Sequence, residues 1–186
     1  MSRPSRLAVP LAVLALTAGL SACGGSSDDE AAASSAPAAP SSSSAFPVSI
    51  ENKFGTTEIP AEPQRVVTVG FNDEDFVLAL GVVPVGVRDL IGDYDAPSRP
   101  WAQEQLGGAE IPTVGGTELD VEAIAALDPD LIVGVYSYID QAVYDQLSQI
   151  APTLAQTDEY ADGATPWQEQ TLLTGQALGR EEQAQA

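Results

Sequence analysis

Apolar runs of strand length alternate with amphipathic helical segments through most of this chain. A hairpin is expected over residues 47–59 and opens the series. Runs with no polar alternation follow at 65–69, 82–87, 111–114 and 131–135, with a weaker one at 152–155. Helical patterns separate or follow them at 73–80, 101–106, 120–127, 141–150 and 165–178. Asp120 is expected to cap the third of these helices, and Thr165 the last, with Gln168 at the capping-box position. Strands that are apolar on both faces and joined by helices predict an α/β fold, with a mostly parallel sheet flanked by helices.

Composition excludes several classes of function. The 186 residues include 7 Lys+Arg against 27 Asp+Glu, with no His, giving a formal net charge of −20. Seven basic side chains are too few to neutralise a nucleic-acid backbone. We therefore expect no nucleic acid as a partner. The lack of His removes the Ser–His–Asp triad and His-rich metal cages, and a single Cys excludes an intrachain disulfide and any Cys-based zinc site. We therefore assign no catalytic and no metal-ligating residues.

The N-terminus carries the signals of an exported, lipid-anchored protein. Arg3 and Arg6 precede an apolar stretch from Leu7 to Leu20, which is too short to span a membrane. The sequence Leu20-Ser21-Ala22-Cys23 resembles the bacterial lipobox. The resemblance implies that residues 1–22 are a lipoprotein signal peptide and that the thiol of Cys23 is acylated. The protein would then sit on the extracytoplasmic face of the cell membrane; the alternative is an ordinary secretory signal. Residues 23–45, rich in Ser, Ala and Pro, are expected to form a flexible tether.

Candidate ligand contacts follow the expected strands. In a parallel sheet, ligands bind outside the carboxyl ends of the strands. Three of the expected strands place aromatic, amide and guanidinium groups there: Phe71, Asn72, Arg88, Tyr136 and Tyr138. Other interpretations remain open at this point. Arg88 could be a surface arginine paired with an aspartate at 89 or 93, the tyrosines could pack under the next helix, and Asn72 could simply cap a helix.

Four segments resemble one protein family. Asp120-Val121-Glu122 through Asp128-Pro129-Asp130-Leu131-Ile132-Val133 resembles the most recognisable segment of the iron-siderophore substrate-binding lipoproteins of bacterial ABC importers. These belong to the helical-backbone class of periplasmic binding proteins. Residues 80–87, 147–153 and 166–181 are also similar to the family. The resemblance implies two lobes joined by a long helix, with the ligand in the cleft between them. Residues 46–163 would be the N-terminal lobe and 164–186 the start of the connecting helix, with the second lobe absent.

The same resemblance implies a function. The protein would capture a ferric siderophore and deliver it to an ABC transporter permease, without catalysis. Iron would enter only as the siderophore complex, so no directly bound cofactor is expected. Glu122 would dock on the permease, the alternative being a solvated helix acid. Trp167 is a sixth ligand candidate, although packing of the last helix onto the lobe is the favoured interpretation for it.

Other ligands and other classes of protein remain as alternatives. Cobalamin or haem could occupy the same architecture. A secreted enzyme using a carboxylate pair such as Asp73 with Glu118, or a purely structural surface lipoprotein, would belong to other classes. The loop from Arg88 to Pro100 holds two arginines and three aspartates. This slightly negative loop favours neutral or cationic hydroxamate complexes over strongly anionic catecholate complexes.

Overall fold

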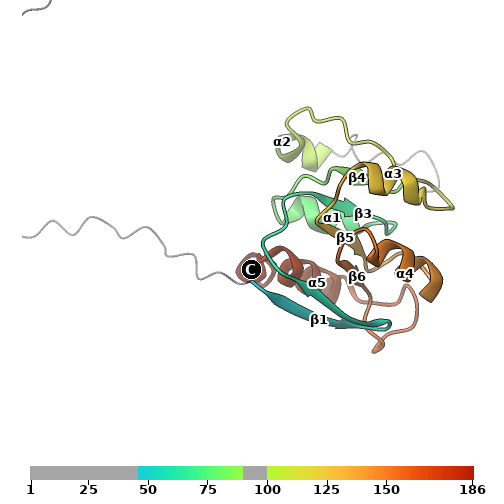
Figure 1. The fold of residues 1–186 in the computed structure, drawn as a ribbon. Coiled ribbons are helices and arrows are strands. Elements are labelled where there is room, and N and C mark those ends of the chain that lie inside the picture. The colour runs from blue at the N-terminus through green and yellow to red at the C-terminus, as the bar shows by residue number, and fades with distance from the viewer. Residues whose placement is uncertain (1–45, 90–99) are drawn as a thin grey trace, which may run out of the picture. The chain divides into compact units, whose positions relative to one another are not determined.

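A parallel sheet of four strands forms the centre of the fold (Figure 1). The structure is a computed structural model and describes residues 46–89 and 100–186. The strands are β3 (Val66–Thr68), β4 (Gly86–Val87), β5 (Leu131–Gly134) and β6 (Thr153–Ala155), in the spatial order β4-β3-β5-β6. Every neighbouring pair is parallel. The predicted α/β class with a mostly parallel sheet is confirmed.

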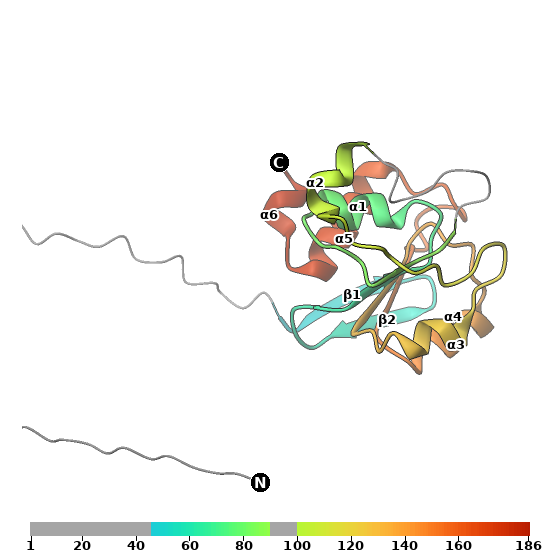
Figure 2. The same ribbon diagram turned by 90° about the horizontal axis from the view of Figure 1, so that it is seen from above.

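Helices cover both faces of this sheet (Figure 2). On one face lie α1 (Asp73–Ala79) and α5 (Trp167–Leu178), and on the other lie α3 (Val121–Ala126) and α4 (Gln141–Ser148). Successive residues of β5 point to opposite faces, so Val133 packs in the cluster that contains Leu178, whereas Ile132 packs with Leu147. Both environments are fully buried, which explains why this run is apolar without alternation.

The predicted hairpin is confirmed as β1 (Val48–Asn52) paired antiparallel with β2 (Gly55–Ile59). Val48, Ile50 and Ile59 are buried in the same cluster as α5. At the turn, the Phe54 amide donates a hydrogen bond of 2.9 Å to Asn52 Oδ1. The next amide back, that of Lys53, donates to the carbonyl of Gln156 at 3.0 Å. The hairpin turn is therefore tied to the chain that follows β6.

Two of the expected strands are shorter than their apolar runs. The run at 82–87 forms only the two residues of β4, and the run at 111–114 contributes a single bridge between Val87 and Thr113. Pro84 and Pro112 interrupt these runs, and proline has no amide hydrogen to donate to a ladder. Burial is incomplete as well, because Val87 and Val114 are buried whereas Pro112 and Thr113 are exposed.

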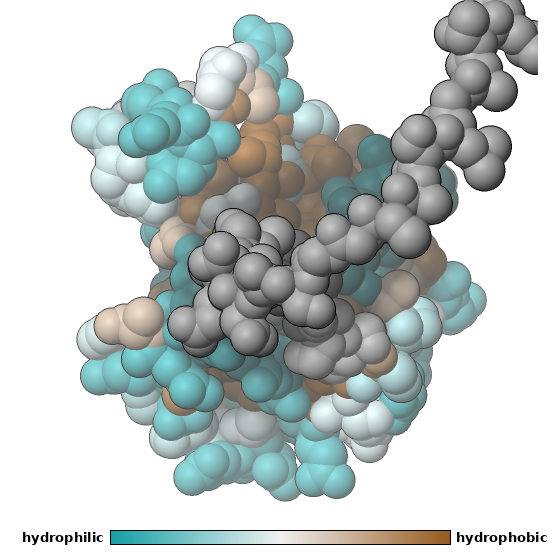
Figure 3. All heavy atoms as spheres, turned by 90° about the vertical axis from the view of Figure 1, so that its left-hand side faces the viewer, coloured by the Kyte–Doolittle hydropathy of each residue, from teal (hydrophilic) through white to brown (hydrophobic). Residues whose placement is uncertain are grey.

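Short helical segments complete the fold. A 3-10 turn, η2 (Pro100–Ala102), leads into α2 (Gln103–Leu106), whose Leu106 packs with Leu78. Figure 3 shows apolar side chains gathered in a hollow beside α2, at the level of α1. α5 ends at Gly179, which has φ +67°, and α6 (Glu181–Ala184) follows. No helix in the described part of the chain is long and apolar enough to cross a membrane.

Predictions about helix caps were right in one case and wrong in another. Asp120 caps α3 as predicted, because its Oδ1 accepts a hydrogen bond of 2.9 Å from the Ala123 amide. The expected capping box at Thr165 and Gln168 is wrong. α5 begins one residue later than predicted, its N-cap is Pro166, and no side chain caps it. The Thr165 hydroxyl is instead buried without a hydrogen-bond partner.

Candidate ligand-binding site

Four predicted ligand-site residues meet at the carboxyl edge of the sheet. Phe71 follows β3, Arg88 follows β4, and Tyr136 and Tyr138 follow β5. The Phe71 ring centroid lies 6.2 Å from each tyrosine ring, and the two tyrosine rings are 5.3 Å apart. The Arg88 guanidinium carbon lies 4.0 Å above the Phe71 ring. We call Phe71, Tyr136 and Tyr138 the aromatic rim, and it presents flat, polarisable surfaces suited to a bulky ligand.

Arg88 is buried beside this rim rather than paired on the surface. Its side chain donates to four backbone carbonyls: Nε to Gly116 at 2.7 Å, one terminal nitrogen to Val69 and Ser137 at 3.1 and 3.0 Å, and the other to Thr117 at 2.8 Å. Only 7% of the residue is exposed, and this burial lowers the pKa of the guanidinium. The surface interpretation of Arg88 is therefore wrong. The side chain joins the loops that carry the rim. The planar guanidinium presents several N–H donors in a fixed geometry, which the single ammonium of a lysine does not.

Tyr138 has a strained backbone conformation. Its φ is +55°, a left-handed conformation that is rare for residues other than glycine and costs on the order of 1–2 kcal/mol. The side chain is 54% exposed, so burial does not compensate for this cost. A hydrogen bond with the Tyr136 side chain raises the pKa of the Tyr138 hydroxyl. Strain of this kind at a strand end is typical of positions used for binding.

A buried carboxyl group lies directly below the rim. Asp73 is 1% exposed, and its Oδ1 accepts a hydrogen bond of 3.2 Å from the Tyr136 amide. Its Oδ2 is buried without a hydrogen-bond partner, and a Cβ at Gly70 would lie only 2.0 Å from this atom. Burial, with a smaller contribution from the neighbouring Glu74, raises the pKa of Asp73 to about 7. Glycine at position 70 is therefore needed to make room for this carboxyl group.

Asn72 precedes α1 but does not cap it with its side chain. It occupies the N-cap position, yet its side chain makes no capping hydrogen bond, and Oδ1 is buried without a partner. The predicted side-chain cap is therefore wrong. The Asp75 amide donates instead to the Asn72 backbone carbonyl at 3.0 Å. The Asn72 side chain remains a candidate ligand contact beside Phe71.

A pocket of about 400 Å³ opens next to the rim. Arg88, Ser137 and Tyr138 form one side of it, and α3, α4 and the segments before them form the rest. The further lining residues are Thr117, Glu118, Leu119, Val121, Ile139, Asp140, Val143 and Gln146. Across residues 46–89 and 100–186, no group of three or more His, Cys, Asp or Glu side chains could hold a metal ion. The site as described is thus an aromatic and hydrogen-bonding surface.

Comparison with known proteins identifies the family. Residues 66–186 match the family described as periplasmic binding protein. The chain belongs to this family. The probable siderophore-binding lipoprotein YfiY of Bacillus subtilis is 35% identical over 136 residues, which cover 71% of this chain and 38% of that protein.

Solved structures of family members share this fold. Staphylococcus aureus SirA complexed with staphyloferrin B is 37% identical with a TM-score of 0.60, covering 74% of this chain and 44% of SirA. Streptococcus pneumoniae PiaA in complex with ferrichrome is 31% identical with a TM-score of 0.63, covering 74% of this chain and 46% of PiaA. The chain therefore spans less than half the length of these relatives. They are binding proteins rather than enzymes, and the resemblance found in the sequence is confirmed.

The carboxylate pair considered for a secreted enzyme does not form a shared site. Asp73 is buried beneath the aromatic rim, whereas Glu118 is exposed at the margin of the pocket. A general acid and a general base must both face the substrate in one cleft. The geometry of these two residues gives no support to that alternative in this periplasmic binding protein.

No contact between the aromatic rim and either Trp167 or Glu122 is found among the described residues. Trp167 is the first residue of α5 and is 65% exposed, so the expectation that it packs this helix onto the lobe is wrong. Among the ring contacts of the described residues, none joins Trp167 to the rim. Glu122 lies in the first turn of α3 and is exposed, as predicted, while Ile124 of the same helix is fully buried. Cys23 and the signal segment lie outside the described residues.

Sequence reasoning did not place at the rim two residues that contact it. These are Asp73, buried below Tyr136, and Gly163, which lies against both tyrosine rings. The dipeptide Asp162-Gly163 is a turn signal, but nothing in it indicates which part of the protein the turn will contact.

Proposed function

We propose that this chain forms a ligand-binding wall of a lipoprotein that captures a ferric siderophore and delivers it to the permease of an ABC importer. The observation that supports this most directly is the aromatic rim at the carboxyl edge of the sheet. In open α/β sheets this edge is where ligands bind. The rim occurs in a chain of the periplasmic binding protein family, and its relatives YfiY, SirA and PiaA are described with siderophores.

We further propose that neutral or cationic hydroxamate complexes are preferred. Arg88 is the cation closest to the rim among the interactions described, and its donors are directed to backbone carbonyls. Lys53 is paired with Asp162. Two exposed acids, Glu118 and Asp140, line the adjoining pocket and would oppose a strongly anionic ligand. The aspartates at 93 and 95 and the arginine at 99, on which the sequence argument also relied, lie outside the described residues.

Paramagnetic broadening tests this function on the chain itself. Ferrichrome is a neutral ferric trihydroxamate, and its high-spin iron broadens NMR signals of nearby protons even when binding is weak. We expect ferrichrome to broaden the ring signals of Tyr136 and Tyr138 more than those of Tyr144, which is buried and stacks on Phe54. The gallium complex serves as the diamagnetic control. A tri-anionic ferric catecholate should broaden the rim signals less at equal concentration. Uniform broadening of all tyrosines, or none, would contradict the proposal.

The membrane anchor is tested separately. We propose that Cys23 carries the lipid and is the attachment point of the protein. Cys23→Ala should move the protein from the membrane fraction to a soluble fraction, or block its processing. Each buried methylene of an acyl chain contributes about 0.8 kcal/mol, so the loss of the acyl chains should be decisive. Unchanged membrane retention of an intact Cys23→Ala protein would reject the anchor.

Permease docking is assigned to Glu122. In the complete transporter, Glu122→Arg should leave ligand affinity near normal and strongly reduce uptake, because like charges would face each other at a basic permease pocket. Glu104→Arg, an equally exposed change on α2, is the matched control and should leave uptake intact. Equal uptake by the two variants, or loss of ligand affinity with Glu122→Arg, would count against the docking role.

A further inference from the structure

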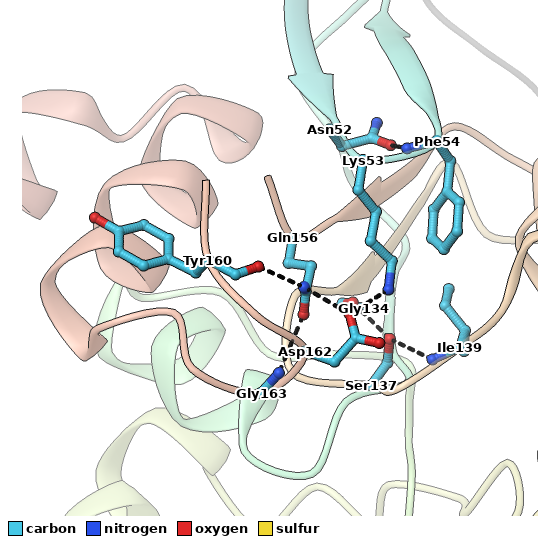
Figure 4. A network of polar contacts seen from close by, with 10 residues as sticks. All are labelled: Asn52, Lys53, Phe54, Gly134, Ser137, Ile139, Gln156, Tyr160, Asp162 and Gly163. Carbon is cyan, nitrogen blue, oxygen red and sulfur yellow. Dashed lines mark hydrogen bonds and ion pairs between the residues drawn. The ribbon is translucent and has the colours of Figure 1, made fainter. Parts of the chain in front are cut away.

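The loop that follows β6 is held by a polar network that begins at the hairpin turn (Figure 4). Lys53 Nζ lies 2.5 Å from Asp162 Oδ1, and the same oxygen accepts a hydrogen bond of 2.9 Å from Gln156 Nε2. Gln156 is only 3% exposed, and its Oε1 accepts from the Gly163 amide at 3.3 Å. Its Nε2 also contacts the carbonyl of Tyr160 at 3.4 Å. One buried glutamine thus fixes both ends of the turn that contains Gly163.

Gly163 in turn lies against the exposed part of the aromatic rim. A Cβ at this position would lie 2.1 Å from the Tyr138 hydroxyl oxygen, 2.5 Å from its Cζ and 2.8 Å from Tyr136 Cε2. Real Cβ atoms do not approach other atoms this closely, so any larger residue at 163 must displace the tyrosine rings. The φ of Gly163 is +72°, which also favours glycine.

We propose that Gly163 is a positioning residue for ligand binding, and that the Lys53–Asp162–Gln156 network holds Gly163 against the Tyr138 ring. This inference rests on the proposed function of the aromatic rim. Tyr138 has strained backbone and a side chain that is more than half exposed, so few contacts determine where its ring stands. The rings of Tyr136 and Phe71 lie beside it, and Gly163 lies against the hydroxyl end of its ring.

The same contacts bear on ligand specificity. The hairpin turn, the loop after β6 and the Tyr138 ring form one continuous path of contacts, so the position of the loop sets how far the ring projects toward a ligand. The turn is itself closed by the Asn52–Phe54 hydrogen bond and joined to Gln156 through the Lys53 amide. Residue 163 would therefore tune the shape of the binding wall without touching the ligand.

A matched pair of glycine variants tests the proposal on this chain. Gly163→Ala introduces both backbone strain and contact with the rings. Gly81→Ala introduces the strain alone, because Gly81 has φ +79° and no atom lies within 4 Å of the point where its Cβ would stand. We expect the NMR ring signals of Tyr136 and Tyr138 to shift in Gly163→Ala and to stay in place in Gly81→Ala. Ferrichrome affinity should fall several-fold in the first variant only, even if both lose similar stability.

Two further variants keep the test decisive if Gly163→Ala fails to fold. Asp162→Asn weakens the network without adding bulk, and Glu62→Gln breaks the surface ion pair with Arg180 as its control. Only Asp162→Asn should shift the tyrosine ring signals. In addition, Gly163→Ala combined with Tyr138→Ala should bind no worse than Tyr138→Ala alone, because the ring that residue 163 positions is gone.

The outcomes separate the two proposals. Ring signals that move equally in Gly163→Ala and Gly81→Ala, or in Asp162→Asn and Glu62→Gln, would overturn the positioning role. Shifted rings with unchanged ferrichrome affinity would also overturn it as a determinant of binding. If ferrichrome leaves the rim signals of the unaltered chain unchanged, the proposed function fails, and the ring shifts alone still decide whether Gly163 sets the position of Tyr138.

Discussion

Two tyrosines, one in α4 and one after β5, differ in almost every physical respect. Tyr144 is 8% exposed, stacks on Phe54 at a centroid distance of 4.7 Å, and lies within 3.4 Å of Asn52 Nδ2 and 3.3 Å of Thr57 Oγ1 through its hydroxyl. Tyr138, at the carboxyl edge, is 54% exposed on a backbone with φ +55°. The first residue is placed where packing and hydrogen bonding favour it, whereas the second is held against its backbone preference.

The polar groups around these tyrosines repeat the contrast. In the hairpin cluster, formed by Asn52, Thr57, Tyr144 and Thr153, the Thr57 hydroxyl donates to the Thr153 carbonyl at 2.6 Å. At the carboxyl edge, Asn72 Oδ1, Asp73 Oδ2 and the Thr165 hydroxyl are buried without partners. The hairpin cluster also borders the larger pocket, of about 510 Å³, but polar groups there bond to one another. Unmet hydrogen bonding and backbone strain are thus found at the edge that we propose for binding and not beside this pocket.

Truncating the two tyrosines should give the largest difference. Tyr144→Ala removes a buried, stacked ring and one of the hydrogen-bond partners of Asn52 and Thr57. We expect a loss of about 3–5 kcal/mol in the free energy of unfolding. Tyr138→Ala should change it by less than about 1 kcal/mol, because the ring is largely exposed. Urea denaturation of both variants measures this. Similar losses for the two would show that the carboxyl edge is as structural as the hairpin cluster.

The buried carboxyl group at the rim should make stability depend on pH. The pKa of Asp73 is about 7 in the folded protein, against an ordinary value of 3.8. Between these values the folded protein holds a proton that the unfolded chain has released, so stability falls as pH rises, by about 1.4 kcal/mol per unit. From pH 5 to pH 8 this contribution amounts to about 3 kcal/mol.

The Asp73→Asn variant isolates that contribution. An amide cannot ionise, so the variant should lose this fall in stability and be more stable than the unaltered chain at pH 8. Denaturation curves at pH 5 and pH 8 give the comparison. If the variant shows the same slope as the unaltered chain, the pH dependence arises elsewhere and the Asp73 carboxyl is not kept protonated by its burial.

Replacing arginine by lysine should cost more stability at the buried Arg88 than at an exposed arginine. Arg88→Lys leaves several of its four carbonyl partners without a donor at a buried site, and we expect a loss of about 2 kcal/mol. Arg65→Lys is the control, since Arg65 also donates to backbone carbonyls, of Leu127 and Asp128, but is exposed. Its loss should stay below about 1 kcal/mol. Equal losses in thermal denaturation would mean that the buried fork at Arg88 has no special role.

The sequence was sufficient for the parts of the fold that depend on periodicity. Runs apolar on both faces predicted the parallel sheet, and strand ends predicted that Phe71, Arg88, Tyr136 and Tyr138 would converge. These inferences work because burial on two faces and the common direction of parallel strands are expressed locally in the chain.

Long-range contacts were not predictable in the same way. The Arg88 side chain donates to carbonyls up to 49 residues away, and Lys53 pairs with a residue 109 positions later. No local pattern encodes such partners. Thr165 shows the reverse error, because its capping sequence is favourable and yet α5 begins one residue later, with the Thr165 hydroxyl left without a partner. The positions where local rules failed, at Asn72, Thr165 and Tyr138, lie on the edge that we assign to binding.

The smallest effect should come from an isosteric pair of threonine variants. Thr57→Val removes a buried hydroxyl that bonds to the Thr153 carbonyl and to Asn52 Nδ2, and should cost about 1–2 kcal/mol because both partners lose a bond. Thr165→Val removes a buried hydroxyl that has no partner, and should be neutral or stabilising by up to about 1 kcal/mol. Chemical denaturation under identical conditions resolves such a difference. If Thr165→Val loses as much stability as Thr57→Val, the carboxyl edge holds an ordered water or another partner that satisfies Thr165. The contrast between a satisfied hairpin cluster and an unsatisfied binding edge would then be smaller than the geometry indicates.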